Sequence, residues 1–232
     1  MKKKVVLLWS GGKDSMLALH AVRENGEYEV VALVTTMTAG IDRISMHGVR
    51  REWLERQAAA LGVPLDTFPI SQGASNTEYE AKLGETLQRY KKNGIDSVLF
   101  GDLFLEDLRK YREDLLAKWG MKCLFPIWTT DTKSLAKKLV DLGYKTIVIC
   151  VDLKALDRSF AGRVVDEAFL RELPPSADPC GENGEFHTFV FDGPGFRQPV
   201  KCSAGAVTIR DRFCFCDLIP SHEAKIARET LR

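Results

Sequence analysis

The apolar run Val5-Val6-Leu7-Leu8-Trp9 leads directly into Ser10-Gly11-Gly12-Lys13-Asp14-Ser15, and this stretch determines what kind of fold the chain can form. Five consecutive apolar residues are typical of a parallel strand that is covered on both faces. The two glycines allow a tight turn, and the amphipathic stretch 14–25 predicts a helix that Asn25-Gly26 ends. Free backbone amides and the positive end of the helix dipole would meet at residues 10–15, which suits phosphate or pyrophosphate.

The side chains of this turn add to the same interpretation. Ser10 and Ser15 offer hydroxyls, Lys13 offers a cation, and Asp14 offers a carboxylate that could cap the helix or hold magnesium. The turn does not match the P-loop pattern GxxxxGK[ST]. It does not match the dinucleotide-binding pattern GxGxxG either, so a nicotinamide cofactor is disfavoured. The alternative is a tight strand-to-helix turn with a serine cap, but the full hexapeptide in this context favours nucleotide binding.

The rest of the chain predicts an α/β fold: a doubly wound parallel sheet, followed by a smaller C-terminal α+β region. Buried strands alternate with amphipathic helices as far as a last strand of this type at 145–151, and a helix is predicted at 156–173. Short alternating strands follow from residue 186 onward. We place the boundary near residues 128–130, giving regions 1–128 and 129–232. The predicted strands of the first series are 5–9, 29–35, 65–70, 96–101, 122–125 and 145–151, and the helices are 14–25, 49–61, 77–93, 106–119 and 131–142.

Composition excludes several classes of protein. Lysine and arginine (33) nearly balance aspartate and glutamate (32) in 232 residues, so a nucleic-acid partner is disfavoured. There is no apolar run of about 18 residues and no secretory leader, which predicts a cytoplasmic protein without a membrane span. The six cysteines include no CxxC pair and are expected to be buried thiols, with Cys214 and Cys216 at strand spacing.

The segment SGGKDS after a first strand resembles the PP-loop ATP pyrophosphatases. That resemblance implies that ATP is split between its α- and β-phosphates, that a carboxylate or carbonyl oxygen is adenylated, and that a nitrogen or sulfur nucleophile displaces AMP. It also implies that adenine lies near the end of the second strand, at Val34 and Thr35. The switch-point rule places the site at the carboxyl ends of the strands.

Three further segments are similar to signatures of the diphthine–ammonia ligase family: MHGVR at 46–50, GDLFLEDLR at 101–109 and PCGENGEFHT at 179–188, extended by DGP at 192–194. The family converts diphthine on a translation elongation factor to diphthamide, using ATP, Mg²⁺ and ammonium. The resemblance therefore implies an amide-forming, AMP- and pyrophosphate-forming ligase here, with another carboxylate acceptor if the source makes no diphthamide. Region 1–128 would bind ATP, and region 129–232 would hold the substrate and ammonia site.

The second of these segments carries two candidate site residues beside Gly101. Gly101-Asp102 closes the fourth parallel strand next to the first, so Asp102 is expected at the switch point, where it could bind magnesium or orient the amine. The alternative for Asp102 is a helix N-cap. Arg109 lies two helical turns on and could clamp a phosphate or a substrate carboxylate, or it could be a surface arginine paired with Glu106 or Glu113.

The third segment gathers Cys180, Glu182, Glu185 and His187 within eight residues. A carboxylate here could deprotonate ammonium or hold it by charge-assisted hydrogen bonds, so we predict catalytic roles for Glu182, Glu185 and His187 alongside Lys13, Asp14 and Asp102. Two alternatives remain for these four residues: they could bind zinc, or they could only stabilise the loop that leads into the next strand. His47, in a polar loop, is expected near the adenylate, or else facing solvent.

Two other functions are weighed against the ligase. A PP-loop enzyme that modifies tRNA would need a basic face and often a CxxC pair, and the near-zero charge argues against it. A non-catalytic module that binds ATP or AMP is the other possibility, because holding phosphate is not the same as hydrolysing it. The sequence also allows a homo-oligomer, and it marks no interface for one.

Overall fold

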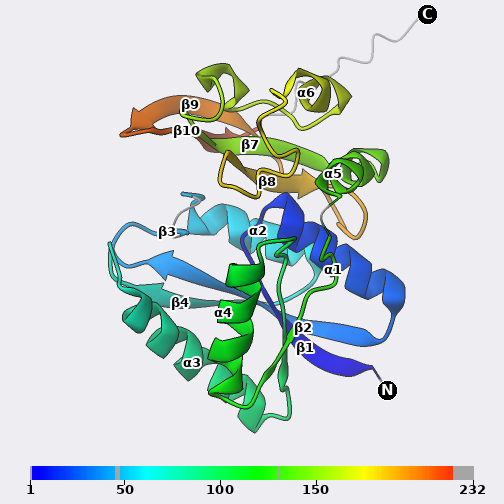
Figure 1. Ribbon diagram of the computed structural model, residues 1–232, viewed down its shortest axis with the longest axis vertical. Helices are drawn as coiled ribbons and strands as arrows, with labels where there is room; N and C mark the ends of the chain where they lie inside the picture. The colour runs from blue at the N-terminus through cyan, green and yellow to red at the C-terminus, as the bar shows by residue number, and fades with distance from the viewer. Residues whose placement is uncertain (1, 45–47, 130, 222–232) are drawn as a thin grey trace, which may run out of the picture.

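The computed structural model describes residues 2–44, 48–129 and 131–221. Its first sheet contains a parallel array in the order β4-β2-β1-β5-β6, with the short β3 antiparallel to the end of β2 (Figure 1). The switch in direction falls between β1 and β5, as the doubly wound prediction requires. The strands are β1 (Lys3–Leu8), β2 (Tyr28–Thr38), β3 (Arg43–Ile44), β4 (Leu65–Ile70), β5 (Ser97–Leu99) and β6 (Lys122–Leu124).

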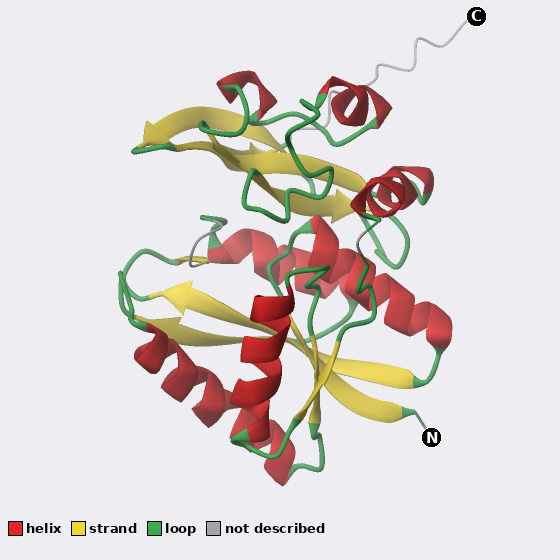
Figure 2. Ribbon diagram, viewed as in Figure 1, coloured by secondary structure: helices red, strands yellow, loops and turns green. Residues whose placement is uncertain are grey.

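Helices cover both faces of this sheet. Helices α1 (Lys13–Asn25) and α2 (Arg51–Leu61) lie on the face toward the second sheet, and α3 (Asn76–Lys92) and α4 (Glu106–Ala117) lie on the other face (Figure 2). Separate apolar clusters on the two sides agree with this layering, because α1 and α2 contribute to one cluster and α3 and α4 to the other. The predicted doubly wound α/β fold is confirmed.

The second sheet is antiparallel, in the order β8-β7-β10-β9. Its strands are β7 (Lys145–Asp152), β8 (Phe186–Asp192), β9 (Cys202–Arg210) and β10 (Phe213–Pro220). The prediction that 145–151 continues the parallel series is wrong, since β7 is a central strand here, antiparallel to β8 and β10. The cause of the error is physical: seven of its eight residues are buried, and a strand covered on both faces has the same apolar pattern in either sheet.

The predicted helix at 156–173 is also wrong, because the segment forms two short pieces: the 3₁₀ turn η1 (Arg158–Phe160) and α6 (Glu167–Glu172). Asp157 and Asp166 start these pieces by accepting hydrogen bonds from the backbone amides of Ser159 and Phe169. Gly162, at φ +82°, breaks the helical path between them. Helix α5 (Thr132–Asp141) is present as predicted, one residue shorter at each end.

Gln57 joins the two sheets from the middle of α2. Its side chain is fully buried, and its Nε2 donates to the carbonyls of Gly11 (2.9 Å) and Val190 (2.6 Å). Its Oε1 accepts from Trp9 Nε1 at 2.9 Å, and the Val190 amide donates to the Gly11 carbonyl at 3.0 Å. The turn after β1 is therefore fixed to the edge of β8.

All six cysteines are free thiols, and five of them are buried while Cys123 is partly exposed. Cys214 and Cys216 lie on β10 and are buried, which confirms the prediction from their spacing. None of the helices in the described part of the chain is long and apolar enough to span a bilayer.

Replacing Gln57 with leucine should destabilise the protein by about 3 kcal/mol, because the Val190 carbonyl and Trp9 Nε1 would stay buried without partners. Urea unfolding of the two proteins measures this difference. Gln88→Leu is the matched control, since Gln88 makes only a 3.5 Å contact with the Trp119 carbonyl. Equal stability of the two variants would contradict the role given to Gln57.

Candidate active site

The turn 10–15 lies at the carboxyl end of β1, where the sheet order reverses. Gly101 follows β5 and packs directly on this turn: a Cβ at Gly101 would lie 2.8 Å from the backbone carbon of Asp14 and 2.9 Å from the amide nitrogen of Ser15. Such a contact is too short for any other residue. The predicted proximity of Gly101-Asp102 to the turn is thus found in the structure.

Hydroxyl groups line the turn. Ser10 Oγ and Ser15 Oγ are 3.1 Å apart, and the Gly12 amide donates to Ser10 Oγ at 3.2 Å. The Lys13 amide donates to Thr188 Oγ1 of β8 at 3.1 Å. Two of the amides expected to face a phosphate therefore already have hydroxyl acceptors. Because a hydroxyl can rotate and donate instead, Ser10 and Thr188 could also contact phosphate oxygens themselves.

Lys13 and Asp14 form an ion pair of 2.9 Å at the start of α1. Lys13 is buried, and its ammonium lies 5.2 Å from the ring centre of Phe186. Burial alone would lower the pKa of Lys13, but attraction to Asp14 and the other acidic groups nearby raises it above the ordinary value. Burial raises the pKa of Asp14 despite the opposing effect of Lys13. Asp14 Oδ1 is buried without a hydrogen-bond partner in the described residues.

Glu182, in the third signature, lies against the segment that follows β5. Its Oε1 accepts a 3.0 Å hydrogen bond from the backbone amide of Leu103, the residue after Asp102. Burial raises the pKa of Glu182 to about 7, and the charges of Asp14 and Asp102 act in the same direction. A carboxyl with this pKa changes protonation near neutral pH, which suits a general base.

Glu185 has a different position. It is buried, and its Oε1 accepts from the Asp178 amide (2.8 Å) and from Asn183 Nδ2 (3.2 Å). Asp178 in turn accepts from the amides of Cys180 and Glu182 through its Oδ1. These bonds hold the turn that carries Glu182, and Glu185 Oε2 is buried without a hydrogen-bond partner among the described groups.

His187 and Cys180 are both held in their neutral forms by burial. Burial, helped by the charge of Lys13, lowers the pKa of His187 to about 4, so the imidazole is uncharged at neutral pH. Burial raises the pKa of Cys180 to about 12, and its thiol donates to the Thr132 carbonyl. Gly181, at φ +65°, packs on the carbonyl of Phe186, the first residue of β8, whereas a Cβ at Gly184 would meet open space.

Asp102 is not a helix cap, since Leu105 is the N-cap of α4. Its Oδ2 accepts from Arg112 Nε at 3.2 Å, an arginine that the sequence interpretation did not single out. Arg109 instead pairs with Glu113 at 2.9 Å, as the surface alternative expected, and its guanidinium lies about 5 Å from the ring centres of Phe125 and Trp128.

Val34 and Thr35 lie inside β2, which runs on to Thr38, three residues beyond the predicted end of the strand. Both side chains are buried, and the Val34 carbonyl accepts from the Trp9 amide. The extension has a clear cause, because residues 36–38 pair with β4 on one side and residues 37–38 pair with β3 on the other. His47 lies outside the described residues.

The residues around the turn fit a magnesium–nucleotide. Gly11 and Gly12 carry no side chain into the turn, and Asp14 Oδ1 is a buried carboxylate oxygen without a partner in the described chain. Within the described ranges, no three His, Cys, Asp or Glu side chains come together as a metal site. Magnesium bound mainly through phosphates needs only one or two carboxylates, so Asp14 would be sufficient.

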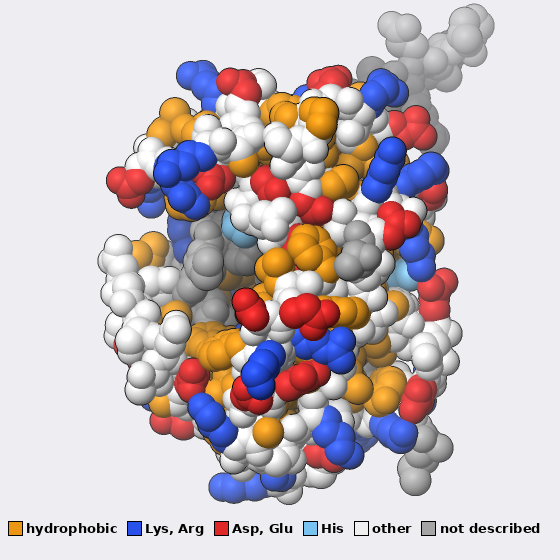
Figure 3. Space-filling model, viewed as in Figure 1, with side chains coloured by type: hydrophobic (Ala, Val, Ile, Leu, Met, Phe, Trp, Pro, Cys, Tyr) orange, Lys and Arg blue, Asp and Glu red, His pale blue; other side chains and the backbone are white. Residues whose placement is uncertain are grey.

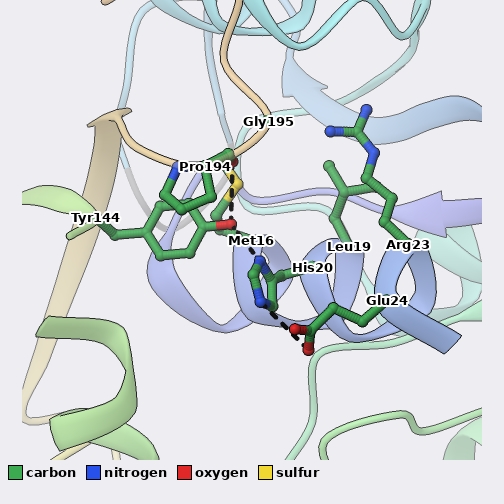
Figure 4. A pocket seen from close by; sticks show the side chains of 8 residues that line it. All are labelled: Met16, Leu19, His20, Arg23, Glu24, Tyr144, Pro194 and Gly195. Atoms are coloured by element: carbon green, nitrogen blue, oxygen red, sulfur yellow. Dashed lines mark hydrogen bonds and ion pairs between the residues drawn. The ribbon is translucent and has the colours of Figure 1, made fainter. Parts of the chain in front are cut away.

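In the view of Figure 3 the surface is recessed between the upper and the lower part of the molecule. A cavity of about 280 Å³ lies between α1 and the residues Tyr144, Pro194 and Gly195, and there Tyr144 bonds to His20 Nδ1 at 3.0 Å and to the Pro194 carbonyl at 3.2 Å (Figure 4). None of the predicted site residues lines this cavity.

Two family models match the chain: the diphthamide synthase N-terminal domain over residues 3–123 and the diphthamide synthase C-terminal domain over residues 131–219. The chain belongs to the diphthamide synthase family. The family resemblance inferred from the three motifs is thereby confirmed. The division predicted after residue 128 falls between the two matched segments.

Proteins named diphthine–ammonia ligase are among the relatives. The one from Bos taurus is 25% identical over 91% of this chain and 87% of its own length, and that from Danio rerio is 26% identical over 91% of each. The human protein is 25% identical over 91% of this chain and 87% of its own length. A solved structure from Methanocaldococcus jannaschii, described as a "predicted subunit of tRNA methyltransferase", covers 81% of this chain and 96% of its own at 15% identity and a TM-score of 0.39, a likeness too low to inform the function.

Replacing Gly101 with alanine should weaken ATP binding at least tenfold, because the new Cβ would push the backbone of Asp14 and Ser15 out of place. Isothermal titration of ATP with Mg²⁺ measures the change. Gly94→Ala is the control: Gly94 has φ +80° and open space around its Cα, so its replacement costs stability and should leave ATP affinity unchanged. Unaltered affinity in Gly101→Ala would contradict this placement of the nucleotide.

Proposed function

We propose that this member of the diphthamide synthase family is an ATP-dependent amide ligase that adenylates an acceptor carboxylate, releases pyrophosphate and forms an amide with ammonia. Family membership and relatives named diphthine–ammonia ligase support the reaction class. The single observation that carries the site assignment is Glu182, a carboxyl with a pKa of about 7 that is bonded to the Leu103 amide in the segment after β5.

In the first half-reaction the triphosphate of ATP lies on residues 10–15. Ser10 and Ser15 donate hydroxyl hydrogen bonds, and Lys13 offsets the charge that develops on the leaving diphosphate. Mg²⁺ held by Asp14 would supply charge neutralisation on the phosphate oxygens. An oxygen of the acceptor carboxylate forms a bond to the α-phosphorus, the bond from that phosphorus to the bridging α–β oxygen breaks, and pyrophosphate leaves.

In the second half-reaction ammonia attacks the acyl carbon and AMP leaves. Glu182 takes one proton from ammonium, which frees the nitrogen lone pair for attack. As the C–N bond forms and the bond from the acyl carbon to the AMP oxygen breaks, the nitrogen gives up a second proton to solvent. Asp102, beside the Leu103 amide that holds Glu182, supplies the second carboxylate of an ammonium subsite. Glu185 keeps the turn that carries Glu182 in shape, and neutral His187 leaves the negative charge of the subsite intact.

The acceptor we propose is diphthine on a translation elongation factor, by analogy with the names of the relatives. Another carboxylate takes this place if the source makes no diphthamide. The partners are then ATP, ammonium and one acceptor protein.

Pyrophosphate and AMP should form in equal amounts when the protein is incubated with ATP, Mg²⁺, ammonium and the elongation factor that carries diphthine. Release of inorganic phosphate in place of pyrophosphate would contradict the mechanism. Tight binding of ATP with no turnover of any acceptor would favour a non-catalytic module. Tight, salt-sensitive binding of tRNA would favour a tRNA-modifying enzyme.

Glu182→Gln should lower kcat/KM for ammonium by about 100-fold and leave the Kd for ATP unchanged, because the lost group acts as a base in the second half-reaction. In the unaltered protein, activity at a fixed concentration of ammonium should rise with pH through a midpoint near 7, as Glu182 loses its proton and becomes able to accept one from ammonium. That midpoint should be absent in Glu182→Gln.

Glu172→Gln is the matched control, because Glu172 pairs with Arg163 on the surface of α6 and should affect neither value. A midpoint near 7 that persists in Glu182→Gln would assign the titrating group to another residue.

A further inference from the structure

Arg112 is held at three points behind Asp102. Its Nε donates to Asp102 Oδ2 at 3.2 Å, its Nη1 donates to the Tyr79 hydroxyl at 3.4 Å, and its guanidinium lies 4.9 Å from the ring centre of Phe100. These partners come from the segment after β5, from α3 and from the residue that follows β5. The Arg112 and Asp102 side chains are only 19% and 16% exposed.

We infer that Arg112 is a positioning residue that fixes Asp102 for the ammonium subsite, an inference that rests on the function proposed above. One oxygen of Asp102 is taken up by Arg112, and no hydrogen bond to Asp102 Oδ1 is found in the described part of the chain. The neighbouring residue, Leu103, fixes Glu182 through its amide. Two carboxylates are thus anchored by adjacent parts of one segment.

The geometry explains why arginine is used at this position. The planar guanidinium bonds Asp102 and Tyr79 from different nitrogens while its face packs on Phe100, and an ammonium group could not make all three contacts. A largely buried ion pair of this kind contributes little net stability, but its hydrogen bond holds the Asp102 side chain in one orientation. Orientation of Asp102 is what a two-carboxylate ammonium subsite requires.

Arg109, one turn earlier on α4, does not meet this description. It bonds Glu113 on its own helix and packs on Phe125 and Trp128, with 36% of its side chain exposed. It contacts neither Asp102 nor Glu182 in any bond observed among the described residues. The arginine of α4 that reaches the site is therefore Arg112.

Steady-state kinetics on Arg112→Met and Arg112→Lys test the inference. Arg112→Met should raise the KM for ammonium roughly tenfold and leave the KM for ATP within about twofold, since only the ammonium subsite is disturbed. Arg112→Lys should restore part of the loss. In an Asp102→Asn background, Arg112→Met should cause no further change in the KM for ammonium, because Arg112 acts through Asp102.

Arg89→Met is the matched control, since Arg89 bonds Asp66 at 3.0 Å beside Tyr90 in a similar Arg–Asp–Tyr group at the start of β4. It should alter neither KM. If Arg112→Met does not fold, Tyr79→Phe provides a milder disturbance, and it should raise the KM for ammonium in the same direction.

A second measurement is independent of activity. The Nε–H signal of Arg112 in ¹⁵N NMR should be protected from exchange in the unaltered protein and lose that protection in Asp102→Asn. Equal changes in both KM values, additive effects in the double variant, or an Nε–H signal insensitive to Asp102→Asn would each overturn the inference. An unaltered protein that shows no ammonium-dependent release of AMP overturns the proposed function instead.

Discussion

The structure depends on the contact between the turn 10–15 and strand β8 of the second sheet. Backbone and side-chain hydrogen bonds join Gly11 to Val190 and Lys13 to Thr188, and Gln57 completes the junction from α2. Because the third signature leads directly into β8, this junction brings Glu182 to the turn that would hold the nucleotide. A site for two half-reactions can then be formed by segments about 170 residues apart in the sequence.

The parallel sheet could be predicted from the sequence, because apolar strands alternate with amphipathic helices there and glycines stand at the junctions. The sequence was insufficient for β7, whose buried pattern is the same in either sheet, and for 156–173, where Gly162 and two aspartate caps override an apparent helix. The end of β2 was misplaced because strand pairing with β3 and β4, which is not local, extends it.

The site was predictable to the level of motifs but not of individual roles. The order of the strands predicted that Gly101 would lie beside the turn, and the close packing of Gly101 on Asp14 agrees. The sequence could not distinguish the roles of Glu182 and Glu185, because these depend on their hydrogen bonds in the folded chain. Glu182 bonds the Leu103 amide, whereas Glu185 bonds the Asp178 amide close to it in the sequence. Gln57 had one available signal, a polar residue on the otherwise apolar face of a helix. The choice between Arg109 and Arg112 depended on how α4 packs against α3 and β5.

A crystal structure with a non-hydrolysable ATP analogue and Mg²⁺ tests the central claim most directly. We expect electron density for the phosphates within hydrogen-bond distance of Ser10, Lys13 and Ser15, with Glu182 on the same side of the turn. Density for the nucleotide in the cavity between α1 and Tyr144, or at any other place with no phosphate on the turn 10–15, would contradict that claim.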